Sequence, residues 1–494
     1  MKPEKLDKVY RISSTIAFCA FCVLMANCTM FGTGNYLHAL GISVLGVTVV
    51  LASVFSVPIM LRDFKKLIKN PYLWAMIAFA VWNVLGIVIG LIKGNPVGAI
   101  FTDINSVIYF VLFPVILSML TSEKRLHILM RIMMYGSMVM GVLACALLFT
   151  YLVSYDTFAK LLAVCNYGYF LNFTHISHTI PRILFFSAPF HACGCAFAVY
   201  FAIKENRIKV SYVLAIGLSL FCMLMTYTRA MYLSALLAAL TLAILFMISL
   251  PIKAWKKLWI NVALGLSICF VILLGFSALG RTNYFGYALE RGFAGMDIPA
   301  IESLMPQATE PAEQDITEPV DETLTPDEQT TNPVDPETTV PTKPEDQPGL
   351  DSYYNEDSFL NATVQSDVYR GEMRAELMEM IEAAPLAGHG FGAPLPRNRT
   401  NIEYSFLELA AKKGVMGVVL YLLPFAMMVL SIFINLWKKK PMLISCAWCA
   451  VLVGLMSYAA FHPYINNAPS TLLYCTALCA HWAEVKLLNK NVEE

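Results

Sequence analysis

The chain carries little charge for its length. Charged residues make up 14% of its 494 residues, whereas water-soluble proteins carry about 25%. The sequence also lacks a Walker phosphate-binding loop, a glycine-rich dinucleotide fingerprint and the zinc motif His-Glu-x-x-His. These absences argue against a string of soluble domains, a nucleotide-driven pump and a cytosolic sugar-nucleotide enzyme. No internal repeat stands out, which weighs against a transporter built from inverted repeats.

Apolar residues take the place of the missing charge and reach 57%, with a mean hydropathy of +0.61. They gather in segments of about 20 residues, the length that crosses a bilayer as a helix. Lys and Arg cluster in every second loop, and the positive-inside rule then places both termini in the cytoplasm. We therefore expect an all-α polytopic membrane protein with an even number of spans. The twelve predicted spans are 12–30, 37–60, 72–92, 99–120, 128–153, 183–203, 210–226, 229–250, 259–278, 411–436, 441–462 and 467–486.

One loop, residues 279–403, is much longer than the others and is exterior by the same rule. It separates a bundle of nine spans (1–278) from a bundle of three (404–494). Its middle part, 305–350, has twelve acidic side chains, nine Pro and no aromatic residue, so we expect it to be disordered. Apolar residues at helical spacing then predict an amphipathic helix over 368–384. A loop of this length is usually functional, although a passive decoration stays possible.

The thirteen cysteines lie almost entirely within the predicted spans. Cys193-x-Cys195 and Cys446-x-x-Cys449 have spacings known from metal and redox sites, but inside apolar helices we interpret them as small packing residues. We expect neither a metal nor another cofactor.

Three segments in the second half of the chain have the pattern of a known family. Residues 226–230 read Thr-Tyr-Thr-Arg-Ala at the start of a span. Residues 370–392 run from an arginine through the amphipathic helix and Pro-Leu to Gly-x-Gly. Glu403 precedes Gly414 and Gly417 at the spacing of a His-[Asn/Ser/Arg]-x9-Gly-x-x-[Gly/Thr/Tyr] motif. These segments resemble the bacterial O-antigen ligase and polymerase family, membrane enzymes that use polyprenyl-diphosphate-linked glycans.

The resemblance implies a GT-C-like glycosyltransferase whose donor is activated by its own lipid diphosphate. Arg229 and Glu403 are then the expected catalytic residues, because guanidinium grips phosphate and a carboxylate can take the proton of an acceptor hydroxyl. Asp103, near the outer end of its predicted span, is a rival base. The expected substrate-binding residues are Arg182, Arg370, Arg374, His389, Gly388 and Gly390.

One departure from the family pattern affects the choice of reaction. Ligases of the family carry His at the position of Glu403 and Asn, Ser or Arg at that of Tyr404. The departure favours a polymerase of lipid-linked repeat units at the outer face of a bacterial cytoplasmic (plasma) membrane. Ligase-type transfer to another acceptor stays open. The expected partners are the lipid-linked glycan, a glycan or lipid acceptor and the bilayer, without nucleic acid.

Two functions of other classes are alternatives. A flippase for the same lipid would line the bundle centre with charge, whereas the charges here gather at the exterior rim. A sensor or scaffold without catalysis would leave Arg229 and Glu403 dispensable.

The topology can be tested with an impermeant thiol reagent on intact cells. A cysteine that replaces Thr330 in the acidic segment should be labelled above the level of the parent chain, because that loop is predicted to be outside. A cysteine that replaces Lys439 should be protected. Labelling at 439 with protection at 330 would invert the topology.

Overall fold

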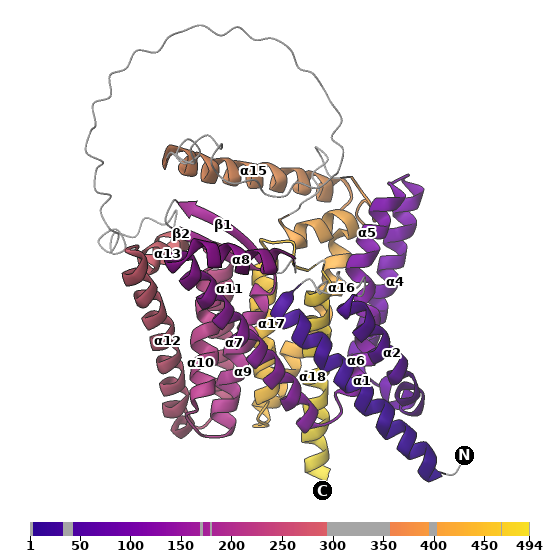
Figure 1. Cartoon of the computed structure of the whole chain (residues 1–494). Coiled ribbons are helices and arrows are strands. Elements are labelled where there is room, and N and C mark those ends of the chain that lie inside the picture. Colours follow the sequence, from indigo (N-terminus) through magenta and orange to yellow (C-terminus); the bar gives the residue numbers. More distant parts are fainter. Residues whose placement is uncertain are drawn as a thin grey trace, which may run out of the picture.

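The computed structural model is a bundle of helices with a small set of elements across one end (Figure 1). It describes residues 3–32, 43–167, 171–177, 180–293, 356–394, 403–465 and 467–493. The acidic segment 305–350 lies outside the described residues. The elements are α1 (Pro3–Phe31), α2 (Val44–Arg62), α3 (Phe64–Leu67), α4 (Pro71–Ile92), α5 (Val97–Val107), η2 (Ile108–Leu112), α6 (Phe113–Met119), α7 (Glu123–Val153), α8 (Tyr155–Tyr167), β1 (Leu171–Ser177), β2 (Ile180–Phe185), η3 (Ala188–Phe190), α9 (His191–Lys204), α10 (Val210–Leu224), α11 (Arg229–Ser249), α12 (Ile252–Gly280), α13 (Tyr284–Phe293), α15 (Glu356–Ala383), α16 (Ser405–Trp437), α17 (Leu443–Ala459) and α18 (Ala468–Glu493).

Eight segments of the described chain are long and apolar enough to cross a membrane, and each overlaps a predicted span. Three further predicted spans coincide with the shorter apolar helices Ala188–Lys204, Val210–Leu224 and Leu443–Ala459. The last predicted span, 467–486, coincides with the first part of α18, which begins at Ala468. The protein is therefore a multi-pass membrane protein, and the count of twelve crossings stays a prediction.

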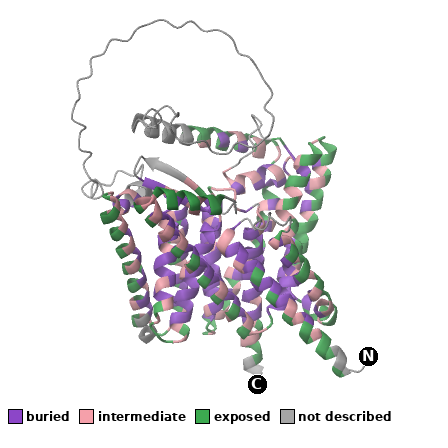
Figure 2. Cartoon of the chain, viewed as in Figure 1, coloured by how far each residue is buried: buried purple, intermediate pink, exposed green. Residues whose placement is uncertain are grey.

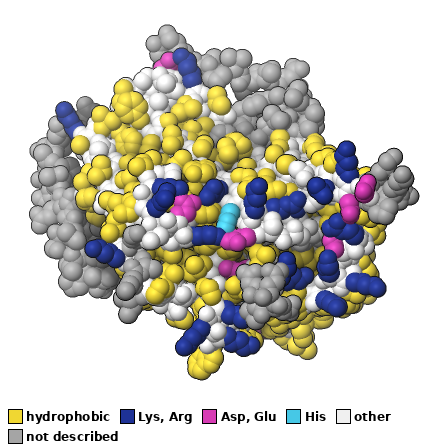
Figure 3. All heavy atoms as spheres, turned by 90° about the horizontal axis from the view of Figure 1, so that it is seen from below, with side chains coloured by type: hydrophobic (Ala, Val, Ile, Leu, Met, Phe, Trp, Pro, Cys, Tyr) yellow, Lys and Arg dark blue, Asp and Glu magenta, His cyan; other side chains and the backbone are white. Residues whose placement is uncertain are grey.

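The two ends of the bundle differ in what they carry. Both chain termini lie at one end, and α8, β1, β2, α13 and α15 lie at the other (Figure 1). Lys and Arg side chains gather on the face that holds the termini (Figure 3). Some are paired there, as in the ion pair between Arg131 and Glu205 at 3.0 Å. This is the distribution that the positive-inside rule associates with a cytoplasmic face.

Helix α4 illustrates how the sequence forms a lipid-facing element. Asn70 caps its start by accepting a hydrogen bond from the Tyr72 amide at 2.8 Å. Pro71 occupies the first turn, where a backbone N–H would have no partner within the helix, so its missing N–H is no loss. One face, with Phe79, is buried, while the opposite face exposes large apolar side chains such as Val81. Exposed residues recur along the outer helices (Figure 2), and many of them are large apolar side chains. In a membrane protein such a face meets lipid tails rather than water.

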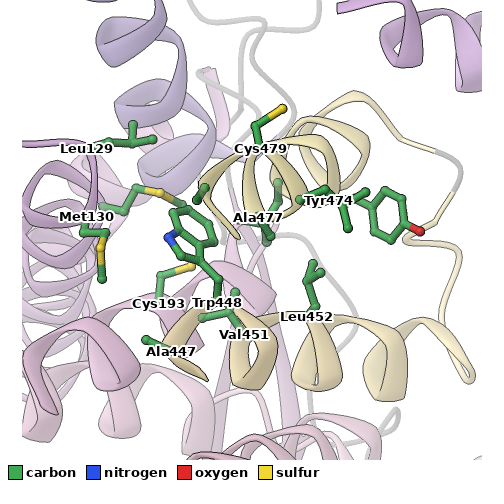
Figure 4. Packing of buried hydrophobic residues seen from close by; sticks show 14 of the residues in the cluster. Leu129, Met130, Cys193, Ala447, Trp448, Val451, Leu452, Tyr474, Ala477 and Cys479 are labelled. Atoms are coloured by element: carbon green, nitrogen blue, oxygen red, sulfur yellow. The ribbon is translucent and has the colours of Figure 1, made fainter. Parts of the chain in front are cut away.

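The core lies where α9, α17 and α18 meet. Trp448 of α17 is fully buried, and its ring packs against that of Phe197 with the centroids 4.7 Å apart. Cys193 and Met130 lie beside the same indole ring, and Cys479 lies on the neighbouring helix (Figure 4). The cysteines of this core therefore fill space between helices.

The structure corrects the start of the predicted span 183–203. Residues 180–185 form strand β2, which pairs antiparallel with β1 so that Thr174 lies opposite Arg182. The helix begins only at His191, after the short turn η3. In the sequence, the apolar run Ile183-Leu184-Phe185 looks like the start of a membrane span. In the structure it is a strand whose residues alternate between buried and partly buried at the end of the bundle.

Two predicted spans are interrupted. The segment predicted as 99–120 consists of α5, the 3-10 turn η2 and α6. Helix α16 begins at Ser405, six residues before the predicted span, and is broken at Gly414, whose φ of 69° and ψ of 174° are not helical. A break frees backbone groups, and inside an apolar bundle these need partners from elsewhere.

The glycine-rich segment after α15 supplies those partners. The amides of His389 and Gly390 donate to the carbonyls of Ala411 and Lys412, each at 2.9 Å. The Trp82 indole donates to the Lys413 carbonyl at 2.9 Å. In return, the Val415 amide donates to the Pro385 carbonyl at 2.8 Å. The segment that follows α15 is thus joined to the break in α16.

Helix α15 covers the predicted amphipathic helix up to Ala383 and begins earlier, at Glu356. Met373 and Leu377 are buried and pack on Ala411 of α16, with Met380 and Ile381 partly buried beside them. The apolar stripe of α15 therefore faces the membrane bundle.

We predict that Gly390→Ala destabilises the protein. Gly390 has a φ of +84°, and a Cβ there would lie 2.3 Å from the backbone nitrogen of Gly90 in α4. Strain of this kind costs of order 1–3 kcal/mol, so the Tm of the purified chain in detergent should fall. Gly275→Ala is the matched control, since a Cβ at that helical glycine meets nothing within 4 Å. Equal Tm values for the two variants would contradict the docking of this segment.

Candidate functional site

Arg182 of β2 holds the turn between α10 and α11. Its Nε donates to the Thr226 carbonyl at 2.8 Å, and a terminal nitrogen donates to Thr228 Oγ1 at 2.9 Å. The Ile183 amide adds a bond to the Met225 carbonyl at 3.1 Å. The strand is thereby fastened to a turn 44 residues further along the chain. This tight turn matches the one that the adjoining predicted spans require.

The same turn places Arg229 as the first residue of α11. Tyr227 within the turn is buried and adopts a left-handed φ of 45°, a conformation that costs energy for a non-glycine residue. Arg182 bonds to the residues on both sides of Tyr227 and so stabilises this conformation. Arg182 and Arg229, both partly buried, therefore belong to one local structure.

Arg370 and Glu403 form an ion pair that joins α15 to the start of α16. The guanidinium Nε donates to the carboxylate. The pair is partly buried, with side-chain exposures of 33% for Arg370 and 25% for Glu403. Two residues singled out in the sequence are thus brought into contact although 33 positions separate them.

Arg374 is placed differently from Arg370. It lies one turn further along α15 and is exposed, whereas Met373 beside it is buried against the bundle. The i, i+4 spacing puts the two arginines on one side of the helix, but only Arg370 lies at the edge that meets Glu403. Arg370 therefore belongs to the ion pair, whereas Arg374 lies on the exposed surface of α15.

His462 is a residue of this site that the sequence reasoning missed. It lies in the short loop between α17 and α18, and its ring stacks on Tyr458 with the centroids 4.6 Å apart and the planes 19° from parallel. The charges of Arg370 and Arg182 both act on its imidazole. One signal was present in the sequence, since an ionisable residue at the end of a predicted span is a candidate for function.

The loop that carries His462 is tied down on both sides. Ser405 Oγ, two residues after Glu403, donates to the His462 carbonyl at 2.6 Å. The hydroxyl of Tyr464 donates to the Phe186 carbonyl, just after β2. The loop therefore bridges the start of α16 and the end of β2, which carry Glu403 and Arg182.

The environment of His462 keeps its imidazole neutral. Burial, followed by the charges of Arg370 and Arg182, lowers the pKa of His462 to about 4. Burial removes water that would solvate the imidazolium, and each guanidinium repels it. At neutral pH the ring is therefore a neutral imidazole, which can accept a proton, and not a charged imidazolium.

Asp103, the rival base, is engaged elsewhere. Its carboxylate accepts from Lys412 Nζ at 2.7 Å and from the Gly392 amide at 2.7 Å. Lys412 also pairs with Glu408 at 2.8 Å. These bonds join α5, α16 and the glycine-rich segment, so Asp103 helps to dock that segment.

His389, Gly388 and Gly390 contact the protein's own backbone. The imidazole Nε2 of His389 lies 2.9 Å from the Met380 carbonyl near the end of α15. A Cβ on Gly388 would meet the backbone of Lys412 and Gly414 at 2.5 Å. These three residues hold α15 against the bundle in the described structure, and a contact with substrate stays a prediction.

The assembled site contains two arginines, a carboxylate and an imidazole from four different segments. Arg370 and Glu403 are in contact, and the charges of Arg370 and Arg182 act on the ring of His462. Strand β2 and helix α15, which carry the two arginines, lie at the end of the bundle opposite the chain termini (Figure 1). Such a set can hold an anion and accept a proton. Among the described residues, no group of three or more His, Cys, Asp or Glu side chains is arranged to hold a metal ion.

The chain matches a known protein family. A family model described as "O-antigen ligase like membrane protein" matches residues 33–480, which contain every residue of the site. No curated protein matches the chain.

Proposed function

Because the chain belongs to the family of O-antigen ligase like membrane proteins, we propose that it transfers a glycan from a polyprenyl diphosphate to a hydroxyl acceptor at the exterior face of the bacterial cytoplasmic membrane. The family supports a membrane glycan-transfer role. The observation that carries the finer proposal is the meeting of Arg182, Arg370, Glu403 and His462 at one end of the bundle. The acceptor is a second lipid-linked unit in the polymerase reaction that we favour.

The donor chemistry explains why arginines dominate this site. A glycan on a lipid diphosphate carries its own leaving group, so the protein has to bind two phosphates and stabilise the charge that develops on them. Arginine stays charged and presents paired donors that match phosphate oxygens. We assign the diphosphate to Arg182, Arg370 and Arg229. Arg374, exposed on α15, adds attraction for an anionic donor at longer range.

The acceptor side needs a group that takes a proton as the new bond forms. Two side chains of the site have that capacity, the carboxylate of Glu403 and the imidazole of His462. Glu403 is paired with Arg370, and the charge of Arg370 acts on His462, so either would act near the diphosphate. His389 and the glycines act on the site by holding α15, and hence Arg370, in place.

The choice between polymerase and ligase rests on Glu403. Ligases of the family are expected to have His there, and this chain has a carboxylate that pairs with Arg370. We therefore favour polymerisation of repeat units, with ligation as the alternative. The glycan of a deletion strain separates them, because single repeat units on the surface indicate a lost polymerase. Intact lipid-linked polymer that stays unattached indicates a lost ligase.

Complementation of that deletion strain tests the role of the site. Arg370→Ala should lower the product roughly 10- to 100-fold, since a hydrogen bond to a charged group contributes about 1.5–3 kcal/mol. Arg374→Ala is the matched control on the same helix, and it should lower the product no more than about fivefold, as exposed charges contribute about 1 kcal/mol or less. Protein amounts in the membrane must be equal. Full product from Arg370→Ala would contradict the proposed function.

Arg229 is tested by a substitution that keeps its charge. Arg229→Lys should lose most of the product, as Arg229→Ala does, because an ammonium cannot make the paired contact of a guanidinium with phosphate. The readout is again the surface glycan, with the amount of inserted protein as the control. If lysine serves as well as arginine, Arg229 only anchors the start of α11.

A further inference from the structure

We propose that His462, rather than Glu403, takes the proton of the acceptor hydroxyl. The assignment rests on the proposed glycan transfer and names the residue that completes it. It comes from the position of the α17–α18 loop, which is bonded to Ser405 beside Glu403 and to Phe186 just after β2. Glu403 in turn is paired with Arg370.

Glu403 is committed to another partner. Its carboxylate accepts the Nε hydrogen of Arg370, and the pair is partly buried. To take a proton from an acceptor, Glu403 would have to give up this charged interaction with Arg370. Held as it is, the carboxylate orients the guanidinium toward the donor. It acts as a positioning residue.

His462 has the opposite situation. Among the described residues, neither ring nitrogen has a hydrogen-bond partner. The ring is still fixed in place, because it stacks on Tyr458 and its backbone carbonyl accepts from Ser405. An imidazole that is held rigidly and has an available lone pair is suited to proton transfer.

The charges around His462 make its pKa depend on whether the lipid diphosphate donor is bound. The charges of Arg370 in α15 and Arg182 in β2 act on the ring, and Glu403 is paired with Arg370. Tyr458 stacks on the ring, and Tyr464 packs on Tyr458. Without a donor, burial and the two arginines lower the pKa of His462 to about 4. A bound diphosphate offsets both positive charges, so it favours the imidazolium and raises that pKa. The base therefore becomes effective when the donor is in place.

The step balances without any co-reactant. The acceptor oxygen forms a bond to the anomeric carbon of the donor sugar while its proton moves to a ring nitrogen of His462. The bond between that carbon and the phosphate oxygen breaks, and its electron pair leaves with the polyprenyl diphosphate on the arginines. The proton then passes from His462 to solvent.

Two matched variants of the full-length chain test the proposal. The purified protein is assayed with lipid-linked glycan extracted from the deletion strain. His462→Gln should lower the rate by about 10²–10⁴-fold, the usual contribution of a general base. Glu403→Gln keeps a hydrogen-bond acceptor for Arg370 and should lower the rate by less than about tenfold. His127→Gln serves as a control, because His127 contacts Tyr200 near the cytoplasmic ends of α7 and α9.

The pH dependence distinguishes a base from a residue that only supports the fold. The wild-type rate should fall as the pH is lowered, with a midpoint above 4 because the bound diphosphate raises the pKa of His462. His462→Gln should lack this acid limb, whereas Glu403→Gln should keep it. His462→Phe preserves the stacking on Tyr458 without a nitrogen atom, so it covers the case in which the glutamine variant fails to fold.

Binding of undecaprenyl diphosphate separates this proposal from the proposed function. The His462 variants should bind it as the wild type does, measured as the rise in Tm on its addition. Loss of the acid limb with retained binding supports His462 as the base. An acid limb that persists in His462→Gln or His462→Phe overturns it, and leaves glycan transfer intact. Full product from Arg370→Ala would instead remove the proposed function itself.

Discussion

The break in α16 at Gly414 frees backbone carbonyls inside an apolar bundle, and the glycine-rich segment after α15 provides the donors that they need. Lipid offers no hydrogen bonds, so the two segments satisfy each other. The glycines allow the approach, as Gly390 lies against the backbone of α4 where any side chain would collide. Helix α15 is anchored through this segment, and Arg370 reaches Glu403 because α15 is held there.

The charged side chains of α5 and α16 are likewise compensated by partners within the protein. Asp103, Glu408 and Lys412 form one network, which joins α5 to α16. Lys413 is buried, and among the described residues its ammonium has no hydrogen-bond partner; it lies over the rings of Phe79 and Phe391 instead, 5.3 and 4.7 Å from their centroids. Aromatic faces can compensate a cation in this way. Phe391 belongs to the glycine-rich segment, so the cation also helps to dock it.

Much of the fold could be predicted from the sequence, because an apolar run long enough to cross a bilayer has to satisfy its backbone hydrogen bonds internally, as a helix does. The pairing of Arg370 with Glu403 was not predictable from spacing, since 33 residues separate them. Arg374 looked equivalent to Arg370 in the sequence, and only the orientation of α15 separates the two. Strand β2 was not predicted, because its apolar residues look like part of a membrane span. The hydrogen bond from Arg182 to Thr226 depends on that strand. His462 sat at the end of a predicted span, where its neighbours in space could not be inferred.

Glu403 stands where the motif leads us to expect a histidine, and its contacts in the structure suggest a different role for it. Judged by the motif alone, a carboxylate replaces an imidazole in the same role. In the structure the carboxylate is paired with Arg370, and the charge of Arg370 also acts on the imidazole of His462 in the α17–α18 loop. Under the proposed mechanism the two tasks of orienting an arginine and accepting a proton are divided between two residues. A motif departure at one position can therefore leave the chemistry of the site unchanged, provided that the fold brings a second residue to it.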